Sequence, residues 1–220
     1  MKILKLILNF FISSIYPPVC GICGKINEEW ICKKCLIKIQ KEAENKHRGY
    51  LKAFYEDGFF AFSYKGEYIK KALLLYKFHN KPYIYRTISK IILKNEKACR
   101  FLKKYDIIIP VPIHKNRKLK RGYNQSELIA IEIGKTLNIK VETNCLIKIK
   151  NIVPQSTLSK EQREQNVKGV YKLQNIQNLQ NKKVVIFDDV YTTGSTLNEC
   201  AKVIKTAGVS KIGIFTIAKD

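Results

Sequence analysis

The 220-residue sequence predicts an α/β fold, in which helices cover both faces of a parallel sheet, preceded by a small metal-binding module. Two observations predict the sheet: short segments that are apolar throughout, and segments of helical period that separate them. A compact group of four cysteines near the N-terminus predicts the module. Hydrophobic residues make up 45% of the chain, which is enough for a packed core.

The first eighteen residues, MKILKLILNFFISSIYPP, resemble a signal peptide because lysines accompany an apolar run. The run from Ile3 to Ile15 is shorter than the ~20 residues of a membrane span. No small-residue cleavage site precedes the cysteines. We expect a short helix that ends at Pro17. It either packs on the domain, which is the favoured alternative, or lies at a membrane surface.

Four of the seven cysteines form two close pairs with the spacing C-x2-C-x8-C-x2-C, and they are Cys20, Cys23, Cys32 and Cys35. Each pair brackets a tight turn, and two such knuckles supply four thiolates to one tetrahedral ion. The alternative is a pair of disulfides in an exported protein. We expect structural Zn²⁺ in a module spanning residues 1–45, ahead of a main domain spanning 46–220. The remaining cysteines are expected to be small buried hydrophobic residues, and they are Cys99, Cys145 and Cys200.

The elements of the main domain follow a charged segment from Lys41 to Lys52, which lacks an apolar period and is the expected linker. Predominantly apolar runs predict strands at 59–64, 106–112, 145–149, 183–187 and 211–218. Apolar residues at helical spacing predict helices around 69–76, 84–92, 128–137 and 197–204, the last ended by Gly208. In such sheets ligands bind beyond the carboxyl ends of the strands.

The charge balance is strongly basic, with 41 Lys and Arg against 18 Asp and Glu. A net charge of +23 favours a polyanionic partner. However, only six of the basic residues are Arg, the residue whose planar fork recognises phosphate best. An AT-rich genome would give the same lysine-rich composition, so charge alone does not establish nucleic-acid binding.

The segment VVIFDDVYTTGSTL (184–197) joins an apolar strand, two adjacent carboxylates and a hydroxyl-rich turn before a helix. Like charges this close repel, so Asp188 and Asp189 are expected to serve a ligand. Free N–H groups and the positive end of the helix dipole make the turn an anion site. Carboxylates beside a phosphate site match ribose 5-phosphate. The turn residues expected to hold the phosphate are Thr192, Thr193, Gly194, Ser195 and Thr196.

This segment closely resembles the 5-phosphoribosyl 1-pyrophosphate (PRPP) motif of type I phosphoribosyltransferases. Two further segments, Ile109 to Ala130 and Pro154 to Tyr171, resemble signatures of the ComF family. Its members join a four-cysteine zinc knuckle to a domain with a type I phosphoribosyltransferase-like parallel sheet. Order and spacing agree over nearly the whole chain. The resemblance implies a cytoplasmic protein that supports DNA uptake in natural transformation, with PRPP, single-stranded DNA and proteins of the competence machinery as partners.

The resemblance also implies roles for individual residues. The two aspartates would hold the ribose hydroxyls, directly or through Mg²⁺. The loop after Pro112 would face pyrophosphate or DNA through Arg117, Lys120 and Arg121, unless it is an exposed basic loop. A hood loop that closes over PRPP would carry Gln155, Arg163 and Asn166, with a plain surface loop as the alternative. His114 either donates to a phosphate or is solvated, and Asn124 and Gln125 either cap the next helix or touch ligand.

One departure from the family of folds concerns catalysis. Purine-salvage members place an aspartate just before Thr-Gly as the proposed general base, and this chain has Thr192 there. Three hypotheses follow: a Mg²⁺-dependent phosphoribosyltransferase with another acceptor, a DNA-binding protein that keeps the PRPP site, and a PRPP-sensing regulator. The missing base favours the second hypothesis slightly.

Overall fold

The computed structural model describes residues 19–220, except 21, 28–30, 53, 80 and 154–158. The expected N-terminal helix and Gln155 therefore lie outside the described residues. Within the described part of the chain, no helix is long and apolar enough to cross a membrane.

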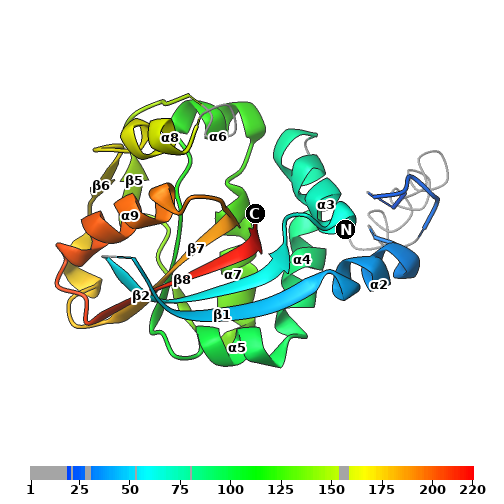
Figure 1. Cartoon of the computed structure of the whole chain (residues 1–220), viewed down its shortest axis with the longest axis horizontal. Coiled ribbons are helices and arrows are strands. Elements are labelled where there is room, and N and C mark those ends of the chain that lie inside the picture. Colours follow the sequence, from blue (N-terminus) through cyan, green and yellow to red (C-terminus); the bar gives the residue numbers. More distant parts are fainter. Residues whose placement is uncertain (1–18, 21, 28–30, 53, 80, 154–158) are drawn as a thin grey trace, which may run out of the picture.

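A six-stranded sheet forms the centre of the molecule, in the order β1-β2-β8-β7-β3-β4 (Figure 1). Five strands run parallel, and β1 pairs antiparallel with β2 at one edge. This arrangement confirms the predicted parallel sheet. The strands are β1 (Ala43–Lys52), β2 (Tyr55–Ser63), β8 (Lys211–Lys219), β7 (Lys183–Tyr191), β3 (Ile107–Pro110) and β4 (Lys140–Val141).

Helices cover both faces of this sheet, as the apolar strands predicted. Along β7, Val185 and Phe187 enter one buried cluster, whereas Val184 and Ile186 enter another on the opposite face. The first cluster is covered by α3 (Glu67–Phe78), α4 (Ile84–Leu93), α5 (Glu96–Leu102) and α7 (Gln125–Leu137). The second is covered by α9 (Ser195–Lys205) and the hairpin of β5 (Leu146–Lys148) and β6 (Tyr171–Leu173).

Two expected loops have regular structure instead. The segment expected as a linker forms β1, where His47 lies opposite Phe59 and Arg48 opposite Gly58. An edge strand forms through backbone pairing on one side, so a charged sequence without alternation is compatible with it. The basic loop after Pro112 forms a short helix, α6 (Lys115–Arg121), which has no buried residue and hence no apolar period to detect.

The four-cysteine module packs on the main domain. Ile22, Ile31 and Ile39 belong to the buried cluster that also contains Phe215. The module ends in α2 (Lys33–Lys41), and Glu42 follows it directly. The Glu42 carboxylate accepts the N–H groups of Tyr68 and Ile69, at 3.0 and 2.8 Å, in the first turn of α3. The predicted boundary between residues 45 and 46 falls within β1 and stays a prediction.

Candidate functional site

The four cysteines of the N-terminal motif come together as one cluster. Their Sγ atoms all lie within 4.8 Å of one another, and those of Cys23 and Cys32 are 3.8 Å apart. A tetrahedral zinc ion with Zn–S bonds of about 2.3 Å separates its sulfur ligands by ~3.8 Å. All seven cysteines are free, so the disulfide alternative is not supported. The cluster is consistent with the predicted zinc knuckle.

The electrostatic setting of the cluster also suits a cation. Burial opposes ionisation of Cys20, but N–H groups that point at its sulfur, including that of Cys32 at 3.4 Å, lower its pKa to about 6. Burial and the neighbouring thiols raise the pKa of Cys35. Thiolates are the metal-binding form, so a bound cation would relieve the crowding of sulfur charge that Cys35 experiences.

The other three cysteines lie elsewhere. Cys145 and Cys200 are fully buried, as predicted, whereas Cys99 is only partly buried. The Cys99 thiol lies 3.3 Å from the carbonyl of Leu93, to which it can donate.

The two adjacent aspartates lie at the carboxyl end of β7, and Asp189 is the more enclosed. Its side chain is only 10% exposed. Lys77 of α3 donates to Oδ1 at 2.8 Å, and Gln125 of α7 donates to Oδ2 at 3.0 Å. Asp189 thus has a structural ion pair, which the sequence analysis did not expect. The positive charge of Lys77 offsets part of the repulsion between the two carboxylates.

Asp188 is different, because no cation pairs with it among the described residues. Ser126 donates to its Oδ1 at 3.2 Å, and so does the backbone N–H of Asp189 at 2.8 Å. Burial, followed by the charge of Asp189, raises the pKa of Asp188 to about 7. A ligand that brings positive charge or hydrogen-bond donors would stabilise the ionised form of this buried carboxylate.

The turn after β7 is shaped by Gly194. Its φ of +75° lies in the left-handed region, and a Cβ there would come within 2.5 Å of the Tyr191 hydroxyl. The hydroxyl groups of Thr193 and Ser195 share a hydrogen bond of 2.6 Å. The backbone N–H groups of Thr196 and Leu197 have no acceptor among the described residues. The turn therefore presents free N–H donors at the start of α9, next to the aspartates.

Cations approach the same edge from a second side. Burial lowers the pKa of Lys148 on β5, and the nearby Arg117 lowers it further, while the charge of Asp188 acts in the opposite direction. Neither Lys148 nor Arg117 forms an ion pair within the described part of the chain. The two side chains repel each other, so an anion between them would relieve that repulsion.

The remaining basic residues of α6 divide into two kinds. Arg121 is half-buried, and Asp189 contributes favourably to its charge. Lys120 is exposed and contacts none of the site residues among the described ones. Lys118 forms an ion pair with Glu127, with Nζ and Oε2 2.9 Å apart. Arg121 thus lies near Asp189, and Arg117 lies near Arg121 and Lys148.

The hood segment lies between β5 and β6 and contains α8 (Lys160–Asn166), which carries Arg163. Asn166 donates to the carbonyl of Val153, at 3.0 Å, and so closes the segment on itself. Neither residue contacts the aspartates within the described part of the chain. Their predicted role toward PRPP stays a prediction.

Two residues with open alternatives have structural roles. His114 is buried and caps α6, because its Nδ1 accepts the N–H of Asn116 at 3.3 Å. It is therefore not the solvated loop residue that was favoured. Asn124 caps α7 by accepting the N–H of Ser126 and also donates to the carbonyl of Val111. Gln125, by contrast, faces Asp189.

Sequence reasoning missed three residues that contact or face the aspartates. Ser126 lies within the segment from Ile109 to Ala130, beside Gln125, so the motif contained the residue without indicating this contact. Lys77 and Lys148 belong to no motif. They reach the site only because α3 and β5 fold against β7, and one lysine among many gives no signal in the sequence.

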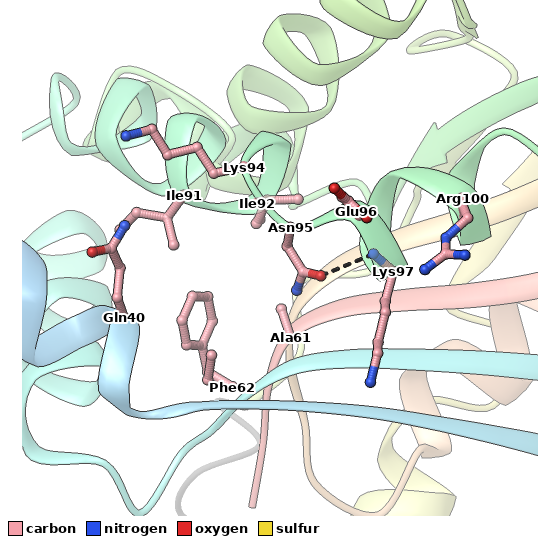
Figure 2. A pocket seen from close by; sticks show the side chains of 11 residues that line it. Gln40, Ala61, Phe62, Ile91, Ile92, Lys94, Asn95, Glu96, Lys97 and Arg100 are labelled. Atoms are coloured by element: carbon pink, nitrogen blue, oxygen red, sulfur yellow. Dashed lines mark hydrogen bonds between the residues drawn. The ribbon is translucent and has the colours of Figure 1, made fainter.

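A separate hollow of about 380 Å³ lies between α2, β2 and the α4–α5 junction (Figure 2). Ala61 and Phe62 line it on the sheet side, and Lys94, Lys97 and Arg100 line it on the helical side. It shares no residue with the aspartate site.

Residues 119–220 match the family model described as "Phosphoribosyl transferase domain". Together with the parallel sheet and the acidic pair at its carboxyl edge, this match defines the main domain as a phosphoribosyltransferase-type domain. The chain belongs to the competence protein F family. It is 34% identical over 161 residues to "Competence protein F" of Haemophilus influenzae, with 70% of each chain covered.

More distant relatives agree. "DNA utilization protein YhgH" of Escherichia coli K12 is 27% identical over 146 residues, covering 65% of this chain and 63% of that one. "Competence protein ComFC" of Bacillus subtilis is 24% identical over 118 residues, covering 53% and 46%. The chain thus spans less than two thirds of these two relatives.

Among solved structures, adenine phosphoribosyltransferase from Rhodothermus marinus aligns with a TM-score of 0.40 at 13% identity, covering 86% of this chain and 88% of that one. A likeness at this level supports no functional statement.

Proposed function

We propose that this protein binds PRPP with Mg²⁺ at the carboxyl edge of its sheet and binds single-stranded DNA in support of DNA uptake. The observation that carries the proposal is that groups suited to phosphates and a carboxylate suited to a sugar or a metal lie together at this edge. Phosphates suit the free N–H donors at the start of α9, and they suit Arg117 and Lys148, which form no ion pair among the described residues. Asp188 suits ribose hydroxyls or a metal. The names of the relatives concern competence and DNA utilisation, which favours DNA as the macromolecular partner.

The residues at this edge fit magnesium, which takes oxygen ligands and keeps several waters when it bridges a carboxylate and phosphates. Asp188 would be the first protein ligand, because its carboxylate has no cationic partner among the described residues. Bound Mg²⁺ would neutralise charge on the phosphates of PRPP. Lys77 would keep Asp189 in place beside the ion.

An active phosphoribosyltransferase is the second candidate, favoured by the complete PRPP motif. In such a reaction, pyrophosphate leaves the sugar as positive charge develops at the anomeric carbon. Arg117 and Lys148 would stabilise the leaving group, and catalysis would rest on positioning and charge. Release of pyrophosphate from PRPP with candidate acceptors would distinguish this candidate from binding alone.

The first test is calorimetric titration with PRPP and Mg²⁺. We expect Asp188→Asn to weaken binding by at least ~1.5 kcal/mol, because a charge-assisted contact is lost while side-chain size is kept. The variant with Asp189→Asn added should bind no better. Since the pKa of Asp188 is about 7, wild-type affinity should rise between pH 6 and pH 8 as the carboxyl loses its proton.

The matched control is Glu56→Gln, which alters an exposed carboxylate at the amino end of β2 and should leave PRPP affinity unchanged. The pH dependence should be smaller in Asp188→Asn than in the wild type. Unchanged affinity in the folded double variant would show that the acidic pair does not bind PRPP.

The second test concerns DNA. Each neutralised phosphate on a single strand lowers log affinity by ~0.7 per log unit of salt, through counterion release. We expect Arg117→Ala with Arg121→Ala to weaken binding to single-stranded DNA and to flatten the salt slope by about 1.4 if each side chain contacts one phosphate. Fluorescence anisotropy over a series of salt concentrations measures both quantities.

Lys182→Ala with Lys205→Ala is the control, because it removes two exposed charges at the amino edge of the sheet. A wild-type slope in the arginine variant would direct attention to Lys33 and Lys34, which are exposed on α2. Lys38 on the same helix is the third candidate, and it already donates one hydrogen bond to the Tyr68 hydroxyl. Absence of DNA binding at low salt would contradict this half of the proposal.

A further inference from the structure

The last turn of α3 is fixed firmly at the edge of the candidate site. The ring of Tyr76 stacks on that of Tyr123, with centroids 5.2 Å apart and planes 20° apart. Tyr76 donates its hydroxyl to the carbonyl of Gln125 at 3.1 Å, and the Tyr123 hydroxyl donates to the carbonyl of Tyr76. Both tyrosines are buried. The next residues of α3 are therefore held in a defined position.

Those next residues point in two directions. Lys77 reaches inward to Asp189, at 2.8 Å. Phe78 remains 67% exposed, although it is a large aromatic residue in a well-anchored turn. A single exposed apolar side chain needs no explanation by itself. Phe78 differs because the guanidinium carbon of Arg121 lies 5.8 Å from the centre of its ring.

The guanidinium of Arg121 is only partly satisfied. Its Nη1 is buried and has no acceptor among the described residues, which is a costly state for a charged group. Burial disfavours the charge of Arg121, and Asp189 favours it. An exposed aromatic face and an unsatisfied guanidinium thus lie together, one residue from the lysine that holds Asp189.

We propose that Phe78, with the guanidinium of Arg121 over its ring, forms a stacking platform for a nucleobase of single-stranded DNA. This inference rests on the proposed function and names the group that the same site recognises beside the sugar phosphate. The base stacks on Phe78 through its face, which every base has. Arg121 lies over the same ring, so the base takes the side of Phe78 that remains exposed.

The test separates stacking from phosphate binding. Binding of a short oligothymidylate is compared with that of an abasic strand of the same number of phosphates. We expect the wild type to prefer the base-bearing strand. Phe78→Ala should lose that preference, a loss of at least about fivefold in affinity for oligothymidylate, and should bind the abasic strand unchanged. Phe78→Trp should retain the preference.

Leu74→Ala is the matched control, because Leu74 is 37% exposed and lies one turn earlier on α3. It should leave both affinities unchanged. Equal binding of both strands by the wild type, or equal weakening of both by Phe78→Ala, would overturn the platform while leaving PRPP binding intact. If neither strand binds, the DNA half of the proposed function fails. The platform is then tested by comparing the affinity for thymidine monophosphate with that for ribose 5-phosphate. A preference for the nucleotide that Phe78→Ala abolishes supports the platform, and equal binding overturns it.

Discussion

Removal of zinc from the four-cysteine cluster is expected to unfold residues 19–41 while β7 and β8 stay folded. A segment this short buries too little surface to fold alone, so its metal-binding energy is its folding energy. In small zinc-finger peptides that energy is about 10–16 kcal/mol at neutral pH. We expect one zinc per chain, and loss of hydrogen-exchange protection in α2 after chelation.

A pair of cysteine variants makes the expectation specific. Cys23→Ser removes one exposed member of the cluster and should abolish zinc binding. Cys99→Ser removes a partly buried thiol outside the cluster and should keep the metal. Metal analysis that finds no zinc in wild-type protein purified under reducing conditions would refute the knuckle. Full protection of α2 after chelation would show that packing against the main domain holds it without metal.

Replacement of Lys77 by Met is expected to lower the free energy of unfolding by about 3–5 kcal/mol, because it leaves the buried Asp189 without its counter-charge. The side chains of this pair are only 18% and 10% exposed. Adding Asp189→Asn to Lys77→Met should recover much of the loss, since the uncompensated charge is then gone. Urea unfolding of the two single variants and the double variant at pH 8 measures the coupling between them.

The pair between Lys118 and Glu127 provides the comparison. Its Nζ–Oε2 distance, 2.9 Å, is nearly the same, but its side chains are 50% and 22% exposed. Lys118→Met should therefore cost no more than about 1 kcal/mol. If both lysine variants cost equally little, the Lys77 pair behaves as a surface contact, and its role in holding Asp189 would be wrong.

The parts of the fold that the sequence predicted are those in which local pattern and burial coincide. The run VVIF (184–187) is apolar throughout because this part of β7 is covered on both faces, so its strand was evident. In contrast, β1 and α6 have charged sequences, because each is stabilised mainly through its backbone. Nothing in the charges of residues 115–121 distinguishes a helix from a loop.

The candidate site divides in the same way. Asp188, Asp189 and the turn at Gly194 are consecutive, so a short motif contains them. The ion pair of Asp189 with Lys77 joins residues far apart in sequence, and no periodicity encodes it. The expectation that repulsion excludes a structural role for the aspartates was incomplete, since a lysine from another helix offsets the repulsion for one of them.

The place of β8 in the sheet has a consequence for biosynthesis. This last strand lies between β2 and β7, with Asp57 opposite Gly213 and Val185 opposite the same glycine on the other side. During translation, β2 and the helices that follow it leave the ribosome before their central neighbour exists. The sheet therefore closes only after β8 has been synthesised, and pairing over such long sequence distances makes closure slow. Until then the apolar edges of β2 and β7 are unpaired, which exposes the nascent chain to aggregation.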